Sequence, residues 1–195
     1  MDARLVGWAR AVKARRRGYG LVPVLWLFTD RSRLPDPLPV IRRLPRGLAG
    51  VVLRDDADPD RAAHGRRIAA ACRAGGIALS VAGDWRLAVA LKAGLHLRGG
   101  RWPSGAPPHL RAWTSSAHGP VDLVRARRRG VVLPFLSPAF ATPSHPDAQP
   151  LGPLRWGLAA RGGKGAAALG GVGGATVRRL PAALCRGAGA ISAFS

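Results

Sequence analysis

Residues 165–174 read Gly-Ala-Ala-Ala-Leu-Gly-Gly-Val-Gly-Gly, a short apolar run that ends in two pairs of glycines. A run of this length bounded by glycine is typical of a buried strand. Gly170-Gly171 and Gly173-Gly174 predict a tight turn, and we expect a helix over residues 175–186 after it. The stretch therefore predicts one strand-and-helix unit of an α/β protein.

The same pattern occurs along the rest of the chain, where short apolar runs bounded by Gly, Pro or polar residues alternate with stretches of helical composition. Repeated units of this kind build a parallel sheet covered by helices. Eight such runs predict a closed (βα)8 TIM barrel of the α/β class. The predicted strands are Val22–Phe28, Gly50–Arg54, Ile77–Val81, Ala93–Leu97, Arg111–Ser115, Gly130–Leu136, Gly165–Leu169 and Ala188–Ala193.

This barrel must be compact, because the fold typically takes about 250 residues and the chain has 195. We expect some helices to be short or absent, above all after the fourth strand, where residues 102–108 are rich in Pro and Gly. Asp58-Pro59 predicts an N-cap and a first-turn proline for a helix that Gly75-Gly76 ends. Asp84 predicts the start of the next helix.

Residues 1–20 form a basic arm before the predicted barrel domain, which spans residues 21–195. Leu5, Trp8, Ala9 and Val12 fall on one stripe of a helix, so the arm is predicted to be a short amphipathic helix. Two interpretations remain open. The helix covers one end of the barrel, or its basic residues contact a membrane surface or nucleic acid.

The composition is strongly basic, with 31 Lys and Arg against 10 Asp and Glu and a formal net charge of +21. Such an excess attracts phosphorylated small molecules as well as nucleic acid. The arginines are spread over the whole sequence without a zinc-finger spacing or basic-aromatic alternation, which disfavours a nucleic-acid partner. The sequence shows no run of about 18 apolar residues and no secretory signal. We therefore expect a cytoplasmic protein without a membrane span.

Polar residues follow the predicted strands at their C-terminal ends, where barrels of this fold build their active sites. The segments that carry them are Leu27–Arg31, Gly50–Asp56, Gly83–Ala88, Gly94–Leu97, Ser116–His118, Ser137–His145, Ala168–Val172 and Gly187–Ala193. Their order and residue types resemble the thiamine-phosphate synthase/TenI family across nearly the whole chain after the arm. The resemblance is distributed, which makes it stronger than any single motif.

The resemblance implies a transferase that joins a hydroxymethylpyrimidine diphosphate to a thiazole phosphate and releases pyrophosphate, assisted by Mg²⁺. The implied catalytic residues are Arg54, Ser116, His118, Thr142, Ser144 and His145. The phosphate of the substrate is assigned to Gly170, Gly171, Ile191 and Ser192. Asp84 is the implied magnesium ligand, and Asp55 and Asp56 are alternative ligands. Carboxylates that hold a hard cation suit a leaving pyrophosphate, and a glycine turn that enters a helix suits a phosphate.

The diphosphate half of this site departs from the family pattern, whereas the glycine half matches it. Val52 replaces a glutamine, Asp55-Asp56 replaces a Glu-Lys pair, Gly83 replaces an asparagine and His145 replaces a lysine. After the fourth strand, residues 98–101 read Arg-Gly-Gly-Arg, so one expected magnesium ligand is missing. Arg101 is a candidate replacement for a lost lysine. The sequence therefore predicts an intact phosphate end and an altered catalytic end.

Two other functions remain open on the same residues. A histidine at the mouth of a barrel can move protons near neutral pH, so His118 suits the thiazole tautomerase branch of the family. The simpler interpretation is that His118 caps the helix over residues 121–129. A third function is a non-catalytic protein that binds thiazole or thiamine phosphate through its glycine end. His96, within a predicted strand, is expected to be a structural partner.

Overall fold

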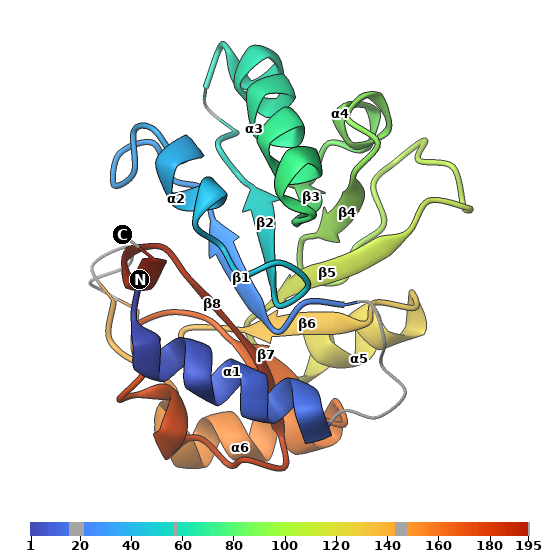
Figure 1. Ribbon diagram of the computed structural model, residues 1–195. Coiled ribbons are helices and arrows are strands. Elements are labelled where there is room, and N and C mark those ends of the chain that lie inside the picture. Colours follow the sequence, from blue (N-terminus) through green and yellow to red (C-terminus); the bar gives the residue numbers. More distant parts are fainter. Residues whose placement is uncertain (16–21, 57, 143–147, 195) are drawn as a thin grey trace.

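The apolar runs pair in chain order and close into a barrel of eight parallel strands (Figure 1). This computed structural model describes residues 1–15, 22–56, 58–142 and 148–194. The barrel closes where Leu25 of the first strand pairs with Ala188 of the last. The strands are β1 (Leu25–Phe28), β2 (Ala49–Leu53), β3 (Ala78–Ala82), β4 (Gly94–Leu97), β5 (Ala112–Ala117), β6 (Leu133–Leu136), β7 (Ala166–Ala168) and β8 (Cys185–Ala190). The predicted TIM barrel is confirmed.

The eighth strand lies earlier in the sequence than predicted. The expected run was Ala188–Ala193, but β8 begins at Cys185, which pairs with Ala166. Gly187, which stands just before the predicted run, lies inside the strand, as does Gly189. A Cβ atom at Gly189 would come within 2.6 Å of the Phe28 ring. Glycine is present there because the barrel interior leaves no space for a side chain.

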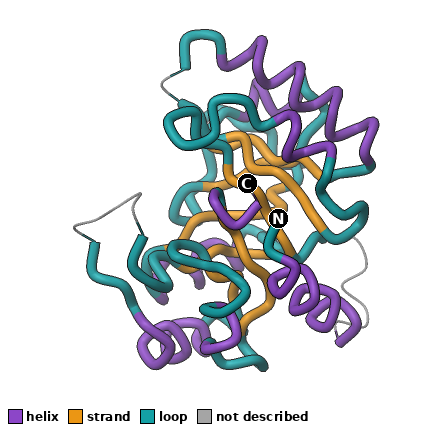
Figure 2. The backbone as a smooth tube through the Cα atoms, turned by 60° about the vertical axis from the view of Figure 1, so that its left-hand side comes forward, coloured by secondary structure: helices purple, strands orange, loops and turns teal. Residues whose placement is uncertain are grey.

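Helices lie around the barrel in the tube view (Figure 2). They are α1 (Ala3–Arg15), α2 (Leu38–Arg42), α3 (Arg61–Gly75), α4 (Trp85–Ala90), α5 (Pro120–Arg128) and α6 (Gly152–Gly162), with 3-10 turns η1 (Val177–Arg179) and η2 (Ser192–Phe194). No helix separates β4 from β5 in the described residues, as predicted. The expected helix over 175–186 is wrong, because only η1 forms there. Pro181 lacks a backbone donor and holds Leu180 in an extended conformation, which ends the turn.

The local signals for α3 and α4 are partly correct. Helix α3 begins at Arg61 with Asp60 at its N-cap, two residues later than the predicted cap at Asp58. The Asp58 carboxylate instead pairs with Arg31 and His64, each at 2.7 Å. Gly76 ends α3 in the left-handed conformation, as predicted. The Asp84 carboxylate caps α4 by accepting a hydrogen bond of 2.9 Å from the backbone N–H of Leu87.

The interior of the barrel is filled by aromatic rings from β1 and β6. Phe28 and Phe135 meet edge to face with ring centroids 5.0 Å apart, and Trp26 meets Phe135 in the same way at 6.3 Å. Interiors of this fold are more often filled by branched aliphatic residues. Here the large rings pack against glycine and alanine from other strands, and a Cβ atom at Gly50 would come within 2.7 Å of the Trp26 ring. A second cluster of buried residues lies between the strands and the helices.

Helix α1 packs against β8 and buries Leu5, Ala9 and Val12, which lie on the predicted apolar stripe. The Asp2 carboxylate accepts hydrogen bonds from the N–H groups of Arg4 and Leu5 at the start of this helix and of Gly174 in the loop after β7. The backbone N–H of Asp2 donates to the Ala193 carbonyl, so the two ends of the chain lie side by side (Figure 2). The helix therefore covers the barrel.

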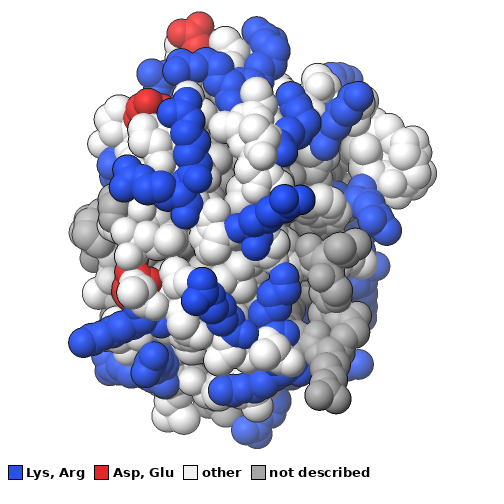
Figure 3. Space-filling view, viewed as in Figure 1, with Lys and Arg blue, Asp and Glu red and all other residues white. Residues whose placement is uncertain are grey.

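The surface charge is spread rather than gathered, as Figure 3 shows for one face of the molecule. Lysine and arginine side chains are scattered over this face among few carboxylates. Within the described part of the chain, no helix has the length and apolarity to cross a bilayer. Cys72 and Cys185 are free and buried, and burial raises the pKa of each thiol to about 12. Both thiols are therefore unreactive at neutral pH.

The Asp2 cap can be tested by the Asp2→Ala change. We expect it to lower the free energy of unfolding by about 1 kcal/mol, the typical cost of a lost helix cap, in urea denaturation at pH 7. The Gly174 N–H holds the pKa of Asp2 below its ordinary value. This contribution is therefore complete at neutral pH and disappears as the pH falls through the lowered pKa.

The Asp60→Ala change is the matched control, because Asp60 occupies the N-cap of α3 without a side-chain capping bond. It should leave the unfolding free energy nearly unchanged. Equal losses in the two variants would contradict the role assigned to Asp2.

Candidate functional site

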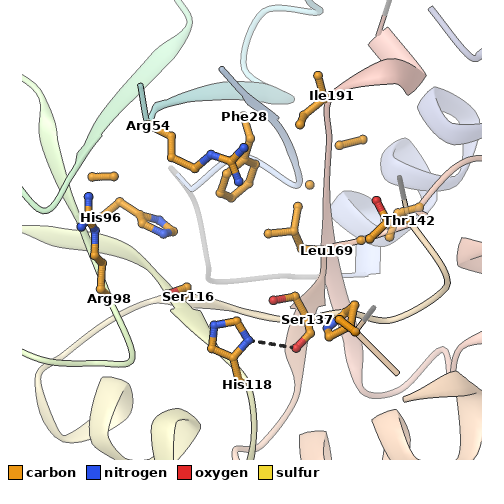
Figure 4. A pocket seen from close by; sticks show the side chains of 18 of the residues that line it. Phe28, Arg54, His96, Arg98, Ser116, His118, Ser137, Thr142, Leu169 and Ile191 are labelled. Atoms are coloured by element: carbon orange, nitrogen blue, oxygen red, sulfur yellow. Dashed lines mark hydrogen bonds between the residues drawn. The ribbon is translucent and has the colours of Figure 1, made fainter. Parts of the chain in front are cut away.

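A cavity of about 710 Å³ opens at the C-terminal end of the barrel strands (Figure 4). This size is suited to a small organic ligand. Its floor is apolar and includes Phe28, Ala82, Leu169, Val172 and Ile191. Its polar wall includes Arg33, Arg54, Asp56, Arg98, Arg101, Ser116, His118, Asp122, Thr142 and Ser192. Of the predicted site residues, the cavity brings together Arg54, Asp56, Ser116, His118, Thr142, Gly170, Gly171, Ile191 and Ser192.

Arg54 is held at the end of β2 by the neighbouring strand β1. Its backbone N–H donates to the buried Thr29 hydroxyl at 3.0 Å, and its guanidinium pairs with Asp30 at 2.9 Å. The sequence Thr29-Asp30 therefore supplies both the anchor and the counter-ion of Arg54. The Arg54 side chain stays 36% exposed, which leaves guanidinium N–H donors accessible from the cavity.

Two more arginines come from a tight turn after β4. Gly99 and Gly100 both have positive φ values, 56° and 69°, and Arg98 and Arg101 form an antiparallel bridge on either side of them. Glycine is favoured at both central positions of such a turn, which places the flanking residues directly opposite each other. The Ser115 and Ser116 hydroxyls accept hydrogen bonds from the N–H groups of Gly100 and Gly99, at 3.0 and 3.2 Å. The turn thus fixes two cationic residues at the cavity wall.

The glycine end of the site is the Gly170-Gly171 turn. It follows β7 and lies across the barrel from these arginines. Gly170 and Gly171 have φ values of 88° and 61°, and both pack against the loop after β6. In the described residues, no hydrogen bond of the fold uses the N–H groups of this pair. The N–H groups of Gly173 and Gly174, by contrast, donate to Thr176 and Asp2. The predicted glycine turn is therefore present, but it does not lead into the expected helix and its second glycine pair serves the fold. Its role in binding phosphate stays a prediction.

Ile191 and Ser192 lie just after β8 and line the same end of the cavity. The Ser192 hydroxyl accepts a hydrogen bond from the guanidinium of Arg33, a residue that sequence reasoning missed. Arg33 follows the predicted Leu27–Arg31 segment by two positions, so its place in the loop after β1 was the available signal. It adds a positive charge beside Ser192, where a phosphate is expected.

His118 follows β5 and points toward the loop after β6 (Figure 4). Its Nδ1 lies 3.3 Å from the Ser137 carbonyl oxygen, which can only accept a hydrogen bond. The bond therefore requires a proton on Nδ1 and leaves Nε2 as the basic nitrogen of the neutral ring. The predicted capping role is wrong, because Gly119 is the N-cap of α5 and the His118 N–H instead donates to Asp122 at 3.0 Å.

His96 is a structural partner, as predicted. It is buried, its Nδ1 lies 2.9 Å from the Thr114 hydroxyl, and its ring meets Phe28 edge to face at 5.6 Å. Burial lowers the pKa of His96 to about 3, so the ring is neutral at physiological pH. It forms part of the cavity lining between the arginine end and the apolar floor.

The carboxylates predicted to hold magnesium do not converge on one point. Asp84 caps α4, and Asp55 accepts a hydrogen bond from the Arg31 N–H at 3.0 Å; neither lines the cavity. Asp56 lines it but pairs with Arg61 and Arg98. In the described ranges, no three His, Cys, Asp or Glu side chains come together. Because the carboxylates nearest the cavity are already paired with guanidinium groups, this donor set does not fit a magnesium ion.

Three of the predicted catalytic residues come from the loop after β6. Thr142 lines the cavity, and Figure 4 shows it on the side of Leu169. Ser144 and His145 lie outside the described residues.

The barrel and this cavity define a class: a (βα)8-barrel protein with a pocket lined by arginines at the C-terminal end of its strands. A family model described as thiamine monophosphate synthase matches residues 29–194, and the chain belongs to this family of thiamine-biosynthesis barrels. The solved structure of a thiamine phosphate pyrophosphorylase from Pyrococcus furiosus is similar, with a TM-score of 0.69 and 19% identity over 89% of this chain and 87% of that one. No curated protein sequence matches the chain. The structural likeness supports the fold.

The packing of the phosphate turn can be tested by the Gly171→Ala change. A Cβ atom there would come within 2.3 Å of the Ala141 carbonyl oxygen, and the φ value of 61° adds strain. The control is Gly130→Ala, where φ is 73° but no atom lies within 4 Å. We expect Gly130→Ala to cost about 1 kcal/mol of unfolding free energy from strain alone and Gly171→Ala to cost clearly more. Equal values in urea denaturation would contradict this packing.

Proposed function

We propose that the chain is a thiamine-phosphate synthase that joins hydroxymethylpyrimidine diphosphate to thiazole phosphate. One observation carries the proposal: a single cavity has two ends suited to phosphate, on opposite sides of the barrel. Arginines from β2 and β4 form one end, and glycines with Ser192 and Arg33 form the other. An apolar floor lies between them in a cavity of about 710 Å³, a size suited to small organic ligands.

The phosphate of the thiazole belongs at the glycine end in this proposal. The N–H groups of Gly170 and Gly171 and the Ser192 hydroxyl supply donors there, and Arg33 supplies charge. Positive φ values and tight packing fix both glycines, so their donors are in place before the ligand binds. Rigid donors lower the entropy that binding costs.

The diphosphate belongs at the arginine end. As the C–O bond to the pyrimidine methylene carbon breaks, the electron pair leaves with pyrophosphate, and the thiazole nitrogen forms the new bond to that carbon. Guanidinium groups that face the diphosphate stabilise the negative charge that develops on the leaving oxygen. Arg54 suits this role because Thr29 and Asp30 hold it at the cavity wall.

Incubation of the purified protein with both precursors, followed by detection of thiamine phosphate, tests the proposal. We expect synthesis, and a loss of about 100-fold or more in kcat/KM in Arg54→Gln, because a charged donor to the leaving group is removed. Arg10→Gln removes the same charge from an exposed position on α1 and should leave the rate unchanged. Thiazole phosphate binding without any synthesis would instead indicate a non-catalytic binding protein.

A second candidate function rests on His118. With Nδ1 donating to the Ser137 carbonyl, the Nε2 of a cavity-lining histidine is available as a base, as a thiazole tautomerase requires. This reaction moves a proton and needs no leaving diphosphate, so the altered arginine end would not impair it.

The tautomerase is tested by following isomerisation of a thiazole phosphate tautomer by absorbance or NMR. If His118 is the base, His118→Ala should slow isomerisation by about 100-fold or more. His109→Ala, which removes an exposed histidine outside the cavity, is the control. An isomerisation rate that His118→Ala leaves unchanged would exclude this role.

A further inference from the structure

The largely buried Arg61 separates two of the carboxylates that the sequence offered for a metal. It is the first residue of α3, and its guanidinium lies 3.2 Å from Asp56 and 3.8 Å from Asp84. It also donates to the Ala82 carbonyl oxygen at 2.8 Å, so it is fixed between the ends of β2 and β3. The Arg61 side chain is only 14% exposed. One guanidinium of the fold thus already pairs with both carboxylates.

The next strand end carries arginines in place of a carboxylate. The Gly99-Gly100 turn after β4 holds Arg98 and Arg101 opposite each other, and both line the cavity. Two like charges at facing positions repel each other unless an anion lies nearby. Asp56 pairs with Arg98. No carboxylate of the described residues forms an ion pair with Arg101, which leaves this charge to be balanced by solvent or a ligand.

These contacts determine what the arginine end can bind. Mg²⁺ needs near-octahedral oxygen ligands at about 2.0–2.1 Å, usually one or two carboxylates and the phosphates of the substrate. Carboxylates held by guanidinium groups are poor ligands, and nearby positive charges oppose a dication. A diphosphate, in contrast, accepts hydrogen bonds from guanidinium groups in a bidentate geometry. Arginine therefore satisfies the ligand without the metal.

We propose that Arg54, Arg98 and Arg101 bind the diphosphate of the substrate directly, and that this end of the cavity needs no divalent cation. The inference rests on the proposed function for the identity of the diphosphate. Arg61 acts behind this set as a positioning residue: it holds Asp56, which in turn holds Arg98.

Calorimetric titration of the whole protein with inorganic pyrophosphate tests the proposal, once in EDTA and once in excess Mg²⁺. We expect saturable binding in EDTA with a Kd no weaker than in Mg²⁺. Arg101→Gln should weaken binding in EDTA by about ten-fold or more, since a charge-assisted hydrogen bond is lost. Arg10→Gln, with the same change of charge on α1 and away from the cavity, should match the wild type. Thermal melting of both variants confirms that they are folded.

Three results would overturn the inference: binding that appears only with Mg²⁺, no binding in either buffer, or an Arg101→Gln variant with unchanged Kd. The synthesis assay, run in EDTA and in Mg²⁺, separates this failure from that of the proposed function. If thiamine phosphate were made only in Mg²⁺, the proposed transferase function would stand and the proposed metal-free site would be wrong. If pyrophosphate bound in EDTA and no synthesis occurred in either buffer, the proposed metal-free site would stand and the proposed transferase function would be wrong.

Discussion

Trp26, Phe28 and Phe135 fill the space inside the barrel, and the other strands must leave room for them. A closed barrel of eight strands has an interior just wide enough for side chains to fill. Because β1 and β6 contribute three large rings, β2 and β8 contribute glycine at facing positions, and Gly50 and Gly189 have no space for a Cβ atom. The same constraint fixes the floor of the cavity. Phe28 is at once a core residue and the base on which a ligand would rest.

The two ends of the cavity follow from the topology. In a parallel barrel all the strands end on one face, so loops that are distant in sequence meet there. Strands β2 and β4 bring Arg54 and the Arg98–Arg101 turn to one side, and β7 and β8 bring Gly171 and Ser192 to the other. Neither end depends on the other for its hydrogen bonds. One end of the site can therefore change in sequence while the other stays intact.

The barrel could be predicted from the sequence because its strands are short apolar runs with clear boundaries. The prediction failed where glycine, which often marks the end of a strand, lay inside one. Gly187 resembles a strand boundary but lies inside β8, because only the three-dimensional packing reveals the Val24 carbonyl oxygen and the Leu133 side chain that leave no space for a Cβ atom there. The helix expected over 175–186 failed because Pro181 limits that segment to a single turn, a local signal that was present in the sequence.

The site was predictable to the extent that each residue follows its own strand. Arg54, His118 and Ser192 lie in the cavity because they stand at strand ends. Arg61 could not be found in this way, since it opens a helix and reaches the site only by crossing to Asp56 and Asp84. Partners of a carboxylate depend on side-chain directions from other elements, which spacing along one strand does not encode. The sequence therefore located the aspartates without showing that they were already paired.

These pairings change what the basic composition means for the site. The chain has 10 acidic residues against 31 basic residues. The carboxylates near the cavity pair with arginines or cap a helix. A metal site needs several uncommitted oxygen ligands in a strict geometry, whereas guanidinium groups bind phosphate oxygens with delocalised charge and several donors. In a chain whose basic residues are almost all arginine, arginine is the side chain most available to bind an anion at this end of the cavity. The excess of arginine and the altered diphosphate end are then related, because arginines bind the anion at the end where a metal ligand is missing.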